Sequence, residues 1–592
     1  MNPDLRVPQS ASPGEAVRVA KEVYGLQVSA SPLPGEYDNN FLIATTQDRA
    51  FVLKLMHPSR DRLFIDLQCR ALRHLEAHAP DISLPRVRPT QRGEAFATVT
   101  LNEGEERFVW LLTFINGKVL AKTNPHTAEL LYSLGGLLGT IDRTLLDFTH
   151  PAATRELKWD SAQALWICKY LSQVKDPLLR ALIERVVERY QSAVVPLLPT
   201  LRRSVIYGDG NDYNVLVRRP IGAPEAVSII DFGDMHHGIV ASDPAIAAAY
   251  AVLGKSDVLA AAASVVSGFH HTLPLDEAEV SVLFPLIEMR LAVSLVNSAC
   301  RKELLPADRY VTVSEEPAKE ALERLSKIHP RFALYVFRNA CSLQPVPRSP
   351  RLEEWLLAQS RSIDSVLNLD LRREPCHLLD LSVSSTILGA DPQNAEVEKL
   401  TETIDQQMKA HQAAVGVGRY DEARLLYTSA LFGGSSNPTD ARRTVHIGID
   451  LFVPAGSNVR APLDGIVHAV ADNRGALDFG PVVIIKHSSG DAGEFFTLYG
   501  HLSRESLRTL YAGRHFTPGD TLRRERLSRR SALPRKTAAG RLICTSRSSL
   551  ICSNSIRTFP VSRRIPSAPF GRVSARTPTC CLGFPPSGFP NS

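Results

Sequence analysis

The chain has 592 residues, of which 44% are hydrophobic and 22% charged, and it carries 40 prolines and nine cysteines. This composition predicts two to four domains with packed cores, and it excludes a disordered chain, a collagen-like repeat and a small disulfide scaffold. The net charge of +6 is unevenly distributed. Residues 521–592 carry 13 Arg, one Lys and one acid, a net of +13, whereas residues 1–520 carry 54 basic and 61 acidic side chains, a net of −7.

The composition of residues 1–520 predicts a cytoplasmic protein. Its opening segment, MNPDLRVPQSASPGEAV, lacks the basic and then apolar order of a signal peptide. The most apolar stretch, residues 245–269, is interrupted by Lys255 and Asp257, which predicts a buried helix and no membrane span. Five cysteines show neither metal-binding spacing nor regular pairing, so we expect isolated buried thiols at Cys69, Cys168, Cys300, Cys341 and Cys376.

Residues 14–120 alternate between strand and helix patterns. The apolar runs at 41–46 and 50–56 predict two strands joined by a short polar turn. Residues 64–78 follow with helical spacing, and residues 96–115 predict a second hairpin. The first part of the chain therefore predicts a small antiparallel sheet with a helix beside it.

Helical spacing dominates residues 127–198 and again residues 244–343. Between them, the β-type runs SVIYGD and AVSIIDFGD flank the turn GNDYNVLV, and a proline-rich stretch near residue 345 marks a domain boundary. Residues 393–413 are polar with helical spacing. The segment VHIGIDLFVPAGSNVRAPLDGIV is rich in β-branched residues, Gly and Pro, which is typical of a glycine-punctuated antiparallel sheet.

Four residues of the first part form the set that phosphoryl transfer requires. Lys54 lies in a predicted strand, Asp209 and Asn214 flank a tight turn, and Asp231 ends an apolar run. A kinase needs a lysine on the nucleotide phosphates, an aspartate beside the attacking hydroxyl and oxygen ligands for Mg²⁺. Taken singly, Lys54 is more typical of a solvated strand and Asp231 of a turn, so the ordered set carries the prediction.

The motifs YGDGNDYN and IDFGD resemble those of the aminoglycoside phosphotransferase and choline kinase-like family, and most closely its hydroxylysine kinase-type members. The resemblance covers residues 14–345 and implies the two-lobed protein-kinase-like fold. It implies that Asp209 is the catalytic base and that Lys54 anchors the α- and β-phosphates of ATP. It also implies that Asn214 and Asp231 bind Mg²⁺.

The sequence departs from this family at two positions. Tyr207 stands where the family has a histidine that supports the catalytic loop. Gln68 stands where an acid would pair with the lysine, and Asp66 lies nearby on a different helix face. We expect Gln68 to accept a hydrogen bond from Lys54 at the nucleotide site. Asp243 matches a family aspartate that supports the structure of the lobe.

A second set of residues predicts metal chemistry. His446 and Asp450 lie four positions apart in VHIGIDL, and His501 follows in TLYGHLS. Residues i and i+4 of a strand point to one face, so the first two side chains can share a metal. Imidazole and carboxylate groups suit Zn²⁺, which needs three protein ligands and a bound water to catalyse hydrolysis.

Residues 423–520 resemble the M23 (lysostaphin-like) peptidases, small antiparallel β-sheet zinc endopeptidases. The resemblance implies His446 and Asp450 as zinc ligands and His501 as a catalytic histidine. The family takes its third ligand from a downstream His-x-His, but this sequence has no histidine after His515. We therefore expect a vestigial site on a module that binds a partner or only folds.

The +13 tail begins where the M23 pattern is lost. Its arginines are not interleaved with stacking aromatic residues, which disfavours nucleic-acid binding. Our hypothesis is that the reading frame shifts near residue 521. Resequencing the source DNA tests it, because an intact open frame without His-x-His in any alternative frame would exclude a shift.

We therefore expect an α+β protein with four parts, namely a kinase-like domain (14–345), a helical linker (346–422), an incomplete M23-like β domain (423–520) and a basic, disordered tail (521–592). The predicted activity is ATP- and Mg²⁺-dependent phosphorylation of a hydroxyl on a small amine-bearing metabolite, of the hydroxylysine or amino-alcohol type. The expected partners are ATP and this acceptor, without a membrane or nucleic acid. Two alternatives stay open, a zinc endopeptidase of the M23 type and a binding scaffold with two degenerate sites.

Overall fold

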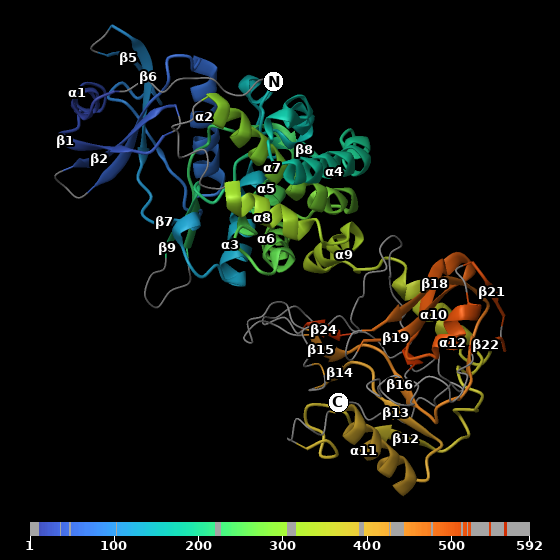
Figure 1. The fold of residues 1–592 in the computed structure, drawn as a ribbon. Coiled ribbons are helices and arrows are strands. Elements are labelled where there is room, and N and C mark those ends of the chain that lie inside the picture. The colour runs from blue at the N-terminus through green and yellow to red at the C-terminus, as the bar shows by residue number, and fades with distance from the viewer. Residues whose placement is uncertain are drawn as a thin grey trace. The chain divides into compact units, whose positions relative to one another are not determined.

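Figure 1 shows the computed structural model of the chain, which divides into two compact units, residues 1–345 and 346–592. The structure describes residues 11–35, 37–45, 49–101, 104–218, 226–304, 315–389, 396–424, 427, 432, 443–474, 478–510, 513–517, 519–522, 544–545 and 562–564. No described helix has the length and apolarity that crossing a membrane requires.

The first unit begins with an antiparallel sheet in the order β1-β2-β3-β6-β4, with β5 also paired to β6 (Figure 1). Its strands are β1 (Val28–Leu33), β2 (Asn39–Thr45), β3 (Ala50–Leu55), β4 (Val87–Arg88), β5 (Ala97–Thr100) and β6 (Glu106–Thr113). Both predicted hairpins are confirmed, because β2 pairs with β3 and β5 with β6. Alternate residues such as Phe41, Ile43 and Leu53 are buried on one face, as strand periodicity requires.

Two helices accompany this sheet. Helix α1 (Pro13–Tyr24) begins with a capping box in which Ser12 and Glu15 bond to each other's backbone. Helix α2 (Arg62–His78), predicted at 64–78, follows β3, and its N-cap residue Asp61 accepts a hydrogen bond from the Phe64 amide.

The rest of the first unit is mainly helical. Its α-helices are α3 (Ala128–Thr144), α4 (Pro177–Ala193), α5 (Ser242–Ala251), α6 (Val258–Thr272), α7 (Glu277–Leu304), α8 (Glu315–Leu325) and α9 (Pro330–Ala340). Its 3-10 helices are η1 (Leu120–Lys122), η2 (Pro151–Ala153), η3 (Ser161–Gln173) and η4 (Val195–Leu197). Helices α3 and α6 cross closely at Gly135 and Gly268, where an added Cβ would lie 1.9 Å from a carbonyl oxygen of the facing helix.

Two short antiparallel ladders hold the loops that carry the predicted site. Strand β9 (Val215–Arg218) pairs with β7 (Lys118–Val119) and with β10 (Ala226–Ile229). Strand β8 (Arg203–Ile206) pairs with β11 (His236–Ile239). The turn with Asp209 and Asn214 therefore connects β8 to β9, and Asp231 lies two residues after the end of β10.

In its described residues, the second unit contains mainly antiparallel ladders and three α-helices. Its strands are β12 (Cys376–Leu379), β13 (Val415–Gly418), β14 (Glu422–Ala423), β15 (Arg443–His446), β16 (Asp450–Phe452), β17 (Val459–Arg460), β18 (Gly465–Asn473), β19 (Gly480–Ser488), β20 (Glu494–Tyr499), β21 (His515–Phe516), β22 (Thr521–Leu522), β23 (Cys544–Thr545) and β24 (Ser562–Arg564). Its helices are α10 (Ser349–Gln359), α11 (Val397–Ala410), α12 (Arg504–Thr509) and the 3-10 helix η8 (Gly490–Ala492). The largest sheet has the order β21-β18-β19-β20-β23.

The segment predicted as a helical linker, residues 346–422, contains strands as well as helices α10 and α11. Strand β12 pairs in parallel with β13, and β13 pairs antiparallel with β16. Val415 and Val417 of β13 are buried in the same apolar cluster as Leu451 of β16 and Val483 of β19. This segment therefore supplies part of the core of the second unit, and the described strands of the tail, β22 to β24, each pair with a strand of that unit.

Candidate active site

Asp209 lies at the centre of the polar contacts in the first unit. Its Oδ2 accepts hydrogen bonds from the Asn214 side-chain amide at 2.7 Å and from that of Asn211 at 2.9 Å. Its Oδ1 accepts a hydrogen bond from Arg290 Nη2 at 2.8 Å. Gly208 precedes it at a φ of 83°, where an added Cβ would lie 2.7 Å from the Asp234 carbonyl oxygen. Glycine is therefore required for this turn.

Burial raises the pKa of the Asp209 carboxyl to about 7, although the Arg290 guanidinium opposes the rise. A carboxylate removed from water is harder to ionise, and a neighbouring cation favours its charged form. The result is a carboxyl group poised near neutral pH. Such a pKa suits a group that exchanges a proton during a reaction.

Lys54 and Asp231 form the second contact of the predicted set. Lys54 Nζ lies 3.5 Å from Asp231 Oδ1, and the lysine side chain is 9% exposed whereas the aspartate side chain is 49% exposed. The Gly233 amide donates a hydrogen bond to the same oxygen at 3.1 Å. Asp231 has a φ of 60°, a left-handed conformation that costs a non-glycine residue energy and often marks a functional site. Lys54 is the main cause that lowers the pKa of Asp231.

Gln68 differs from its expected role. Its side-chain nitrogen donates to the Phe64 carbonyl oxygen of its own helix at 3.2 Å, and its Oε1 has no hydrogen-bond partner among the described residues. The expected hydrogen bond from Lys54 is therefore not formed, because the lysine lies against Asp231. Asp66 faces away and pairs with Arg70 and His150.

Tyr207 connects the two loops of the site. It is buried, and its hydroxyl donates a hydrogen bond to the Ile230 carbonyl oxygen at 2.6 Å, beside Asp231. The two oxygens of Asp243 accept hydrogen bonds from the amides of Tyr207 and Gly208. The supporting position expected for Asp243 is thus present, and the tyrosine occupies the place of the family histidine as a buried hydrogen-bonding support.

Sequence reasoning missed Arg290 and Trp159. Arg290 lies on α7 with its side chain 3% exposed, and its guanidinium carbon is 4.4 Å from the centre of the Trp159 ring. The sequence held a signal for it, since an arginine in the apolar segment LFPLIEMRLAV is rarely buried without a partner. That signal does not identify the partner, which lies 81 positions earlier in the chain.

The side-chain oxygens of Asn214 and Asp231 suit the binding of a magnesium ion. The Asn214 amide nitrogen is engaged by the Asp209 carboxylate, which turns its side-chain oxygen away from that group. Asp231 presents a half-exposed carboxylate in a left-handed turn. Amide and carboxylate oxygens are the protein ligands that Mg²⁺ prefers, together with water and phosphate oxygens.

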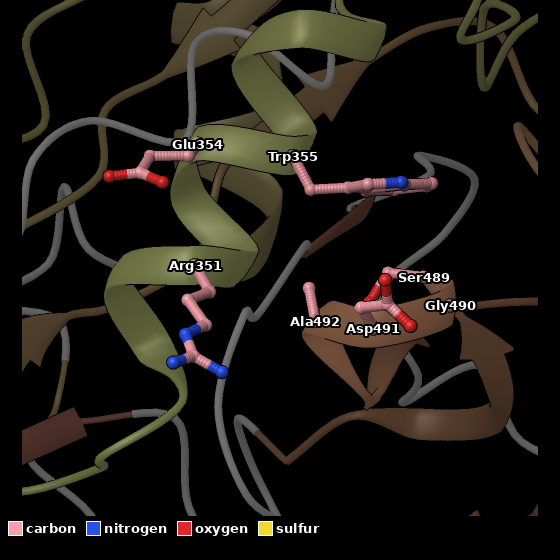
Figure 2. Close-up of a pocket in the computed structure, with 7 residues that line it drawn as sticks. All are labelled: Arg351, Glu354, Trp355, Ser489, Gly490, Asp491 and Ala492. Carbon is pink, nitrogen blue, oxygen red and sulfur yellow. The ribbon is translucent and has the colours of Figure 1, made fainter.

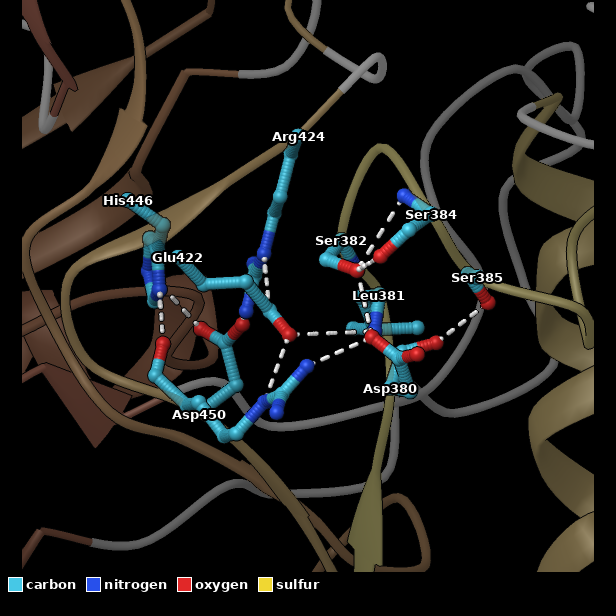
Figure 3. Close-up of polar contacts among 10 residues, drawn as sticks. Asp380, Leu381, Ser382, Ser384, Ser385, Glu422, Arg424, His446 and Asp450 are labelled. Atoms are coloured by element: carbon cyan, nitrogen blue, oxygen red, sulfur yellow. Dashed lines mark hydrogen bonds and ion pairs between the residues drawn. The ribbon is translucent and has the colours of Figure 1, made fainter. Parts of the chain in front are cut away.

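His446 and Asp450, the predicted zinc ligands, lie in the second unit and form ion pairs with each other and with Arg424 (Figure 3). His446 Nε2 lies 3.3 Å from Asp450 Oδ1, and Arg424 Nη1 donates to Asp450 Oδ2 at 2.6 Å. Arg424 Nε donates to Glu422, whose other oxygen accepts a hydrogen bond from Arg419. His446 and Arg424 hold the pKa of Asp450 below its usual range despite its burial.

These residues do not fit a catalytic zinc ion. Buried Arg424 binds Oδ2 of Asp450 and leaves to a metal only Oδ1, which faces His446 Nε2 and has no hydrogen-bond partner among the described residues. Among the described residues, no three His, Cys, Asp or Glu side chains gather into a metal-binding group. His501 lies after β20 in a left-handed conformation, and His515 is exposed on β21. Neither completes a ligand set with His446.

A shallow pocket of about 760 Å³ lies elsewhere in the second unit (Figure 2). Arg351, Glu354 and Trp355 of α10 line it opposite the turn 489–492. None of the predicted metal or catalytic residues lines this pocket. It is therefore separate from the His446 cluster.

Two family models match the chain. The phosphotransferase enzyme family (APH) matches residues 29–272, and peptidase family M23 matches residues 444–524. Hydroxylysine kinase of Danio rerio is 31% identical over 327 residues, which cover 53% of this chain and 91% of that protein. Hydroxylysine kinase of Xenopus laevis is 28% identical over 344 residues, which cover 54% and 90%. Among solved structures, the amicoumacin kinase hAmiN is 15% identical with a TM-score of 0.42, over 53% of this chain and 94% of that chain.

Proposed function

Because the chain belongs to the phosphotransferase enzyme family through its first unit, we propose that it is a Mg·ATP-dependent kinase of a small, amine-bearing metabolite with a hydroxyl group. The observation that carries this proposal is a pair of contacts. Asp209 binds Asn214 within the turn between β8 and β9, and Lys54 of β3 lies against Asp231, which follows β10. The likeness to hydroxylysine kinases supports hydroxylysine or a related amino alcohol as acceptor.

In the proposed mechanism, Asp209 Oδ1 accepts the proton of the acceptor hydroxyl. The hydroxyl oxygen attacks the γ-phosphorus of ATP, the bond from that phosphorus to the β-γ bridging oxygen breaks, and ADP leaves. Lys54 binds the α- and β-phosphates and thereby fixes the position of the nucleotide. Asn214 and Asp231 would hold magnesium, which neutralises phosphate charge when it is bound. Arg290 keeps the Asp209 carboxylate in place.

Asp209 can accept this proton without losing its present contacts. Its Oδ2 accepts two hydrogen bonds from side chains, whereas Oδ1 accepts one and has lone-pair capacity for one more donor. A pKa near 7 makes the ionised form available at neutral pH and lets the carboxyl hold the proton until product leaves.

We assign this activity to residues 14–345 and place it in the cytoplasm, where the donor ATP is available. For the M23-like region, residues 423–520, we propose a role without hydrolysis, because Arg424 occupies the Asp450 carboxylate. His446 and Asp450, the two predicted zinc ligands, then stabilise the fold of this region.

The test is acceptor-dependent ADP formation by the full-length chain with Mg·ATP. The acceptor panel contains hydroxylysine, ethanolamine, aminopropanol, choline and an aminoglycoside. We expect turnover with a small hydroxy-amine and none without an acceptor. Absence of turnover with every member, in a folded chain, contradicts the proposal.

A further inference from the structure

Two fully buried carboxyl groups meet beside the turn between β8 and β9. Asp142 lies on α3 and Asp243 on α5, both residues are 0% exposed, and their side chains are in hydrogen-bonding contact. The same two helices contact the turn one helical turn away, at positions 138 and 247. An added Cβ at Gly210 would lie 3.4 Å from Leu138 Cδ1 and 3.3 Å from Ala247 Cβ. The packing of α3 and α5 against the turn therefore holds the two carboxyl groups together.

The two carboxyl groups differ in their partners. Asp243 Oδ2 accepts a hydrogen bond from the Tyr207 amide at 2.9 Å, and Oδ1 accepts one from the Gly208 amide at 2.7 Å. Neither oxygen of Asp142 has an N–H or O–H partner at hydrogen-bond geometry among the described residues. Amide donors stabilise the ionised form of a carboxyl group, and two carboxyl groups that share a buried site cannot both be ionised. The proton of the pair therefore belongs on Asp142, whose hydroxyl donates to Asp243.

The charges around the pair agree with this assignment. Burial and then the neighbouring Asp243 raise the pKa of Asp142 well above its usual value, and the nearby Tyr207 amide and the Arg202 guanidinium oppose the rise. Burial also raises the pKa of Asp243, but the hydrogen bond from Asp142, the two amides and His236 of β11 oppose that rise. Asp142 is thus the member of the pair that holds a proton more firmly.

The other groups near this part of α3 are unchanged when Asp142 is replaced. Arg202 is itself paired with Glu279 of α7 at 2.9 Å. Helix α2 presents His74, whose Nε2 lies 2.9 Å from the Thr144 carbonyl oxygen. Helix α6 meets α3 through uncharged side chains beside Gly139, and β10 contains no charged residue. A comparison of variants at position 142 therefore isolates the effect of one carboxyl group.

We propose that Asp142 is a positioning residue, whose protonated carboxyl group donates a hydrogen bond to Asp243 and thereby fixes the two amides that precede the catalytic base. The consequence for Asp209 rests on the proposed function, whereas the shared proton is a property of the fold alone. Two buried acids then have different roles, because Asp142 keeps its proton while Asp209 exchanges one.

The first test detects the proton through stability. A carboxyl group that is protonated in the folded chain and ionised in the unfolded chain takes up a proton on folding, so its contribution to stability falls as the pH rises from the unfolded pKa, about 3.9, to the folded pKa. Asp142→Asn supplies an amide that donates the same hydrogen bond without this proton uptake. As the pH rises from about 5 to about 7, the unfolding constant of the wild-type chain should increase relative to that of Asp142→Asn by about tenfold per pH unit.

Urea unfolding of the full-length chain, followed by tryptophan fluorescence, measures these constants. Three of the four tryptophans, Trp110, Trp159 and Trp166, lie in the first unit and report on its unfolding. The matched control is Glu129→Gln, which replaces an exposed carboxylate in the first turn of α3. It should keep the pH dependence of the wild-type chain.

The second test measures the effect on the base. Asp142→Ala removes the donor to Asp243, so kcat should fall by about tenfold to a hundredfold while KM for Mg·ATP stays the same, because the base is displaced and the nucleotide site is not. Asp142→Asn should restore most of the lost kcat, since its amide donates in place of the acid.

Three results overturn the inference. They are the same pH dependence of unfolding in the wild-type chain and Asp142→Asn, failure of Asp142→Asn to fold, and a loss of kcat in Asp142→Asn equal to that in Asp142→Ala. A tenfold effect per pH unit in a chain that phosphorylates no acceptor would establish the shared proton and contradict the proposed kinase activity, so the two failures are distinguishable.

Discussion

At the scale of single residues, the site depends on one buried ion pair. Arg290 and Asp209 are both removed from water, and their contact offsets part of the cost of burying each charge. Removing the arginine would leave the aspartate buried beside Asp234 and Asp231, which also raise its pKa. The pair therefore sets the charge state of the proposed base.

The pH dependence of activity tests this pair. A base must be ionised, so kcat/KM for the acceptor should be lost as the pH falls through the pKa of Asp209, about 7. Arg290→Gln removes a cation that lowers this pKa, so the acidic limb should move to higher pH. An unmoved limb in a folded variant would show that Arg290 does not act on the base.

Much of the residue-scale site was predictable, and the rest was not, for physical reasons. The positions of Lys54, Asp209, Asn214 and Asp231 could be predicted because motif spacing and strand ends are local properties of the sequence. The partner of Lys54 could not, since its choice between Gln68 and Asp231 depends on a loop that follows a distant strand. The catalytic role of Asp209, the phosphate-binding role of Lys54 and the metal-binding roles of Asn214 and Asp231 remain predictions.

At the scale of elements, the helical half of the first unit depends on the close packing of α3 against α6. The motif LGGLLG lies in α3, and its glycines differ in what they face. An added Cβ at Gly135 would overlap the Val265 carbonyl oxygen, whereas one at Gly136 would lie 3.7 Å from Thr272 Oγ1, an ordinary contact. Alanine substitutions at Gly135 and Gly136 therefore compare a close helix–helix contact with an ordinary one in the same helix.

Gly135→Ala should destabilise the chain by about 1–3 kcal/mol, because the helices must separate to admit the methyl group. Gly136→Ala should be neutral or stabilise it by up to about 1 kcal/mol, since alanine favours the helix. Urea unfolding followed by circular dichroism measures both. Equal effects of the two substitutions would refute the close-contact explanation.

The elements that sequence periodicity predicted are those with long amphipathic repeats or paired neighbours, such as α2 and the β2–β3 hairpin. Strands β12 and β13 were missed within the expected linker. Each has four residues and pairs with a strand that is distant in sequence, so the local sequence pattern does not predict it. Short strands of this kind take their stability from the sheet they join.

At the scale of the whole molecule, the two units differ in what their predicted sites retain. The first unit brings its four residues into two contacts, while the second unit ties His446 and Asp450 to Arg424. The uneven charge does not follow this division, because the basic tail from residue 521 lies within the second unit.

The purified chain should therefore retain far less than one zinc ion per molecule after dialysis. The positive Arg424 repels a divalent cation, and displacing it from the Asp450 carboxylate would break a buried ion pair, which costs about 3–5 kcal/mol when one partner is lost. Elemental analysis by mass spectrometry measures the metal content, with a carbonic anhydrase sample as the positive control. Equimolar zinc would contradict the ion-paired site.

The most direct test of the central claim compares phosphoryl transfer by the wild-type chain with that of Asp209→Asn, using the acceptor that gives turnover. Mass spectrometry detects the phosphorylated acceptor, and the coupled release of ADP gives the rate. We predict one ADP for each phosphorylated acceptor and a fall in kcat of about 10²–10⁴ in Asp209→Asn, the usual contribution of a general base. The matched control Asp147→Asn, at an exposed carboxylate, should keep the wild-type rate. Equal rates in wild type and Asp209→Asn would contradict the account.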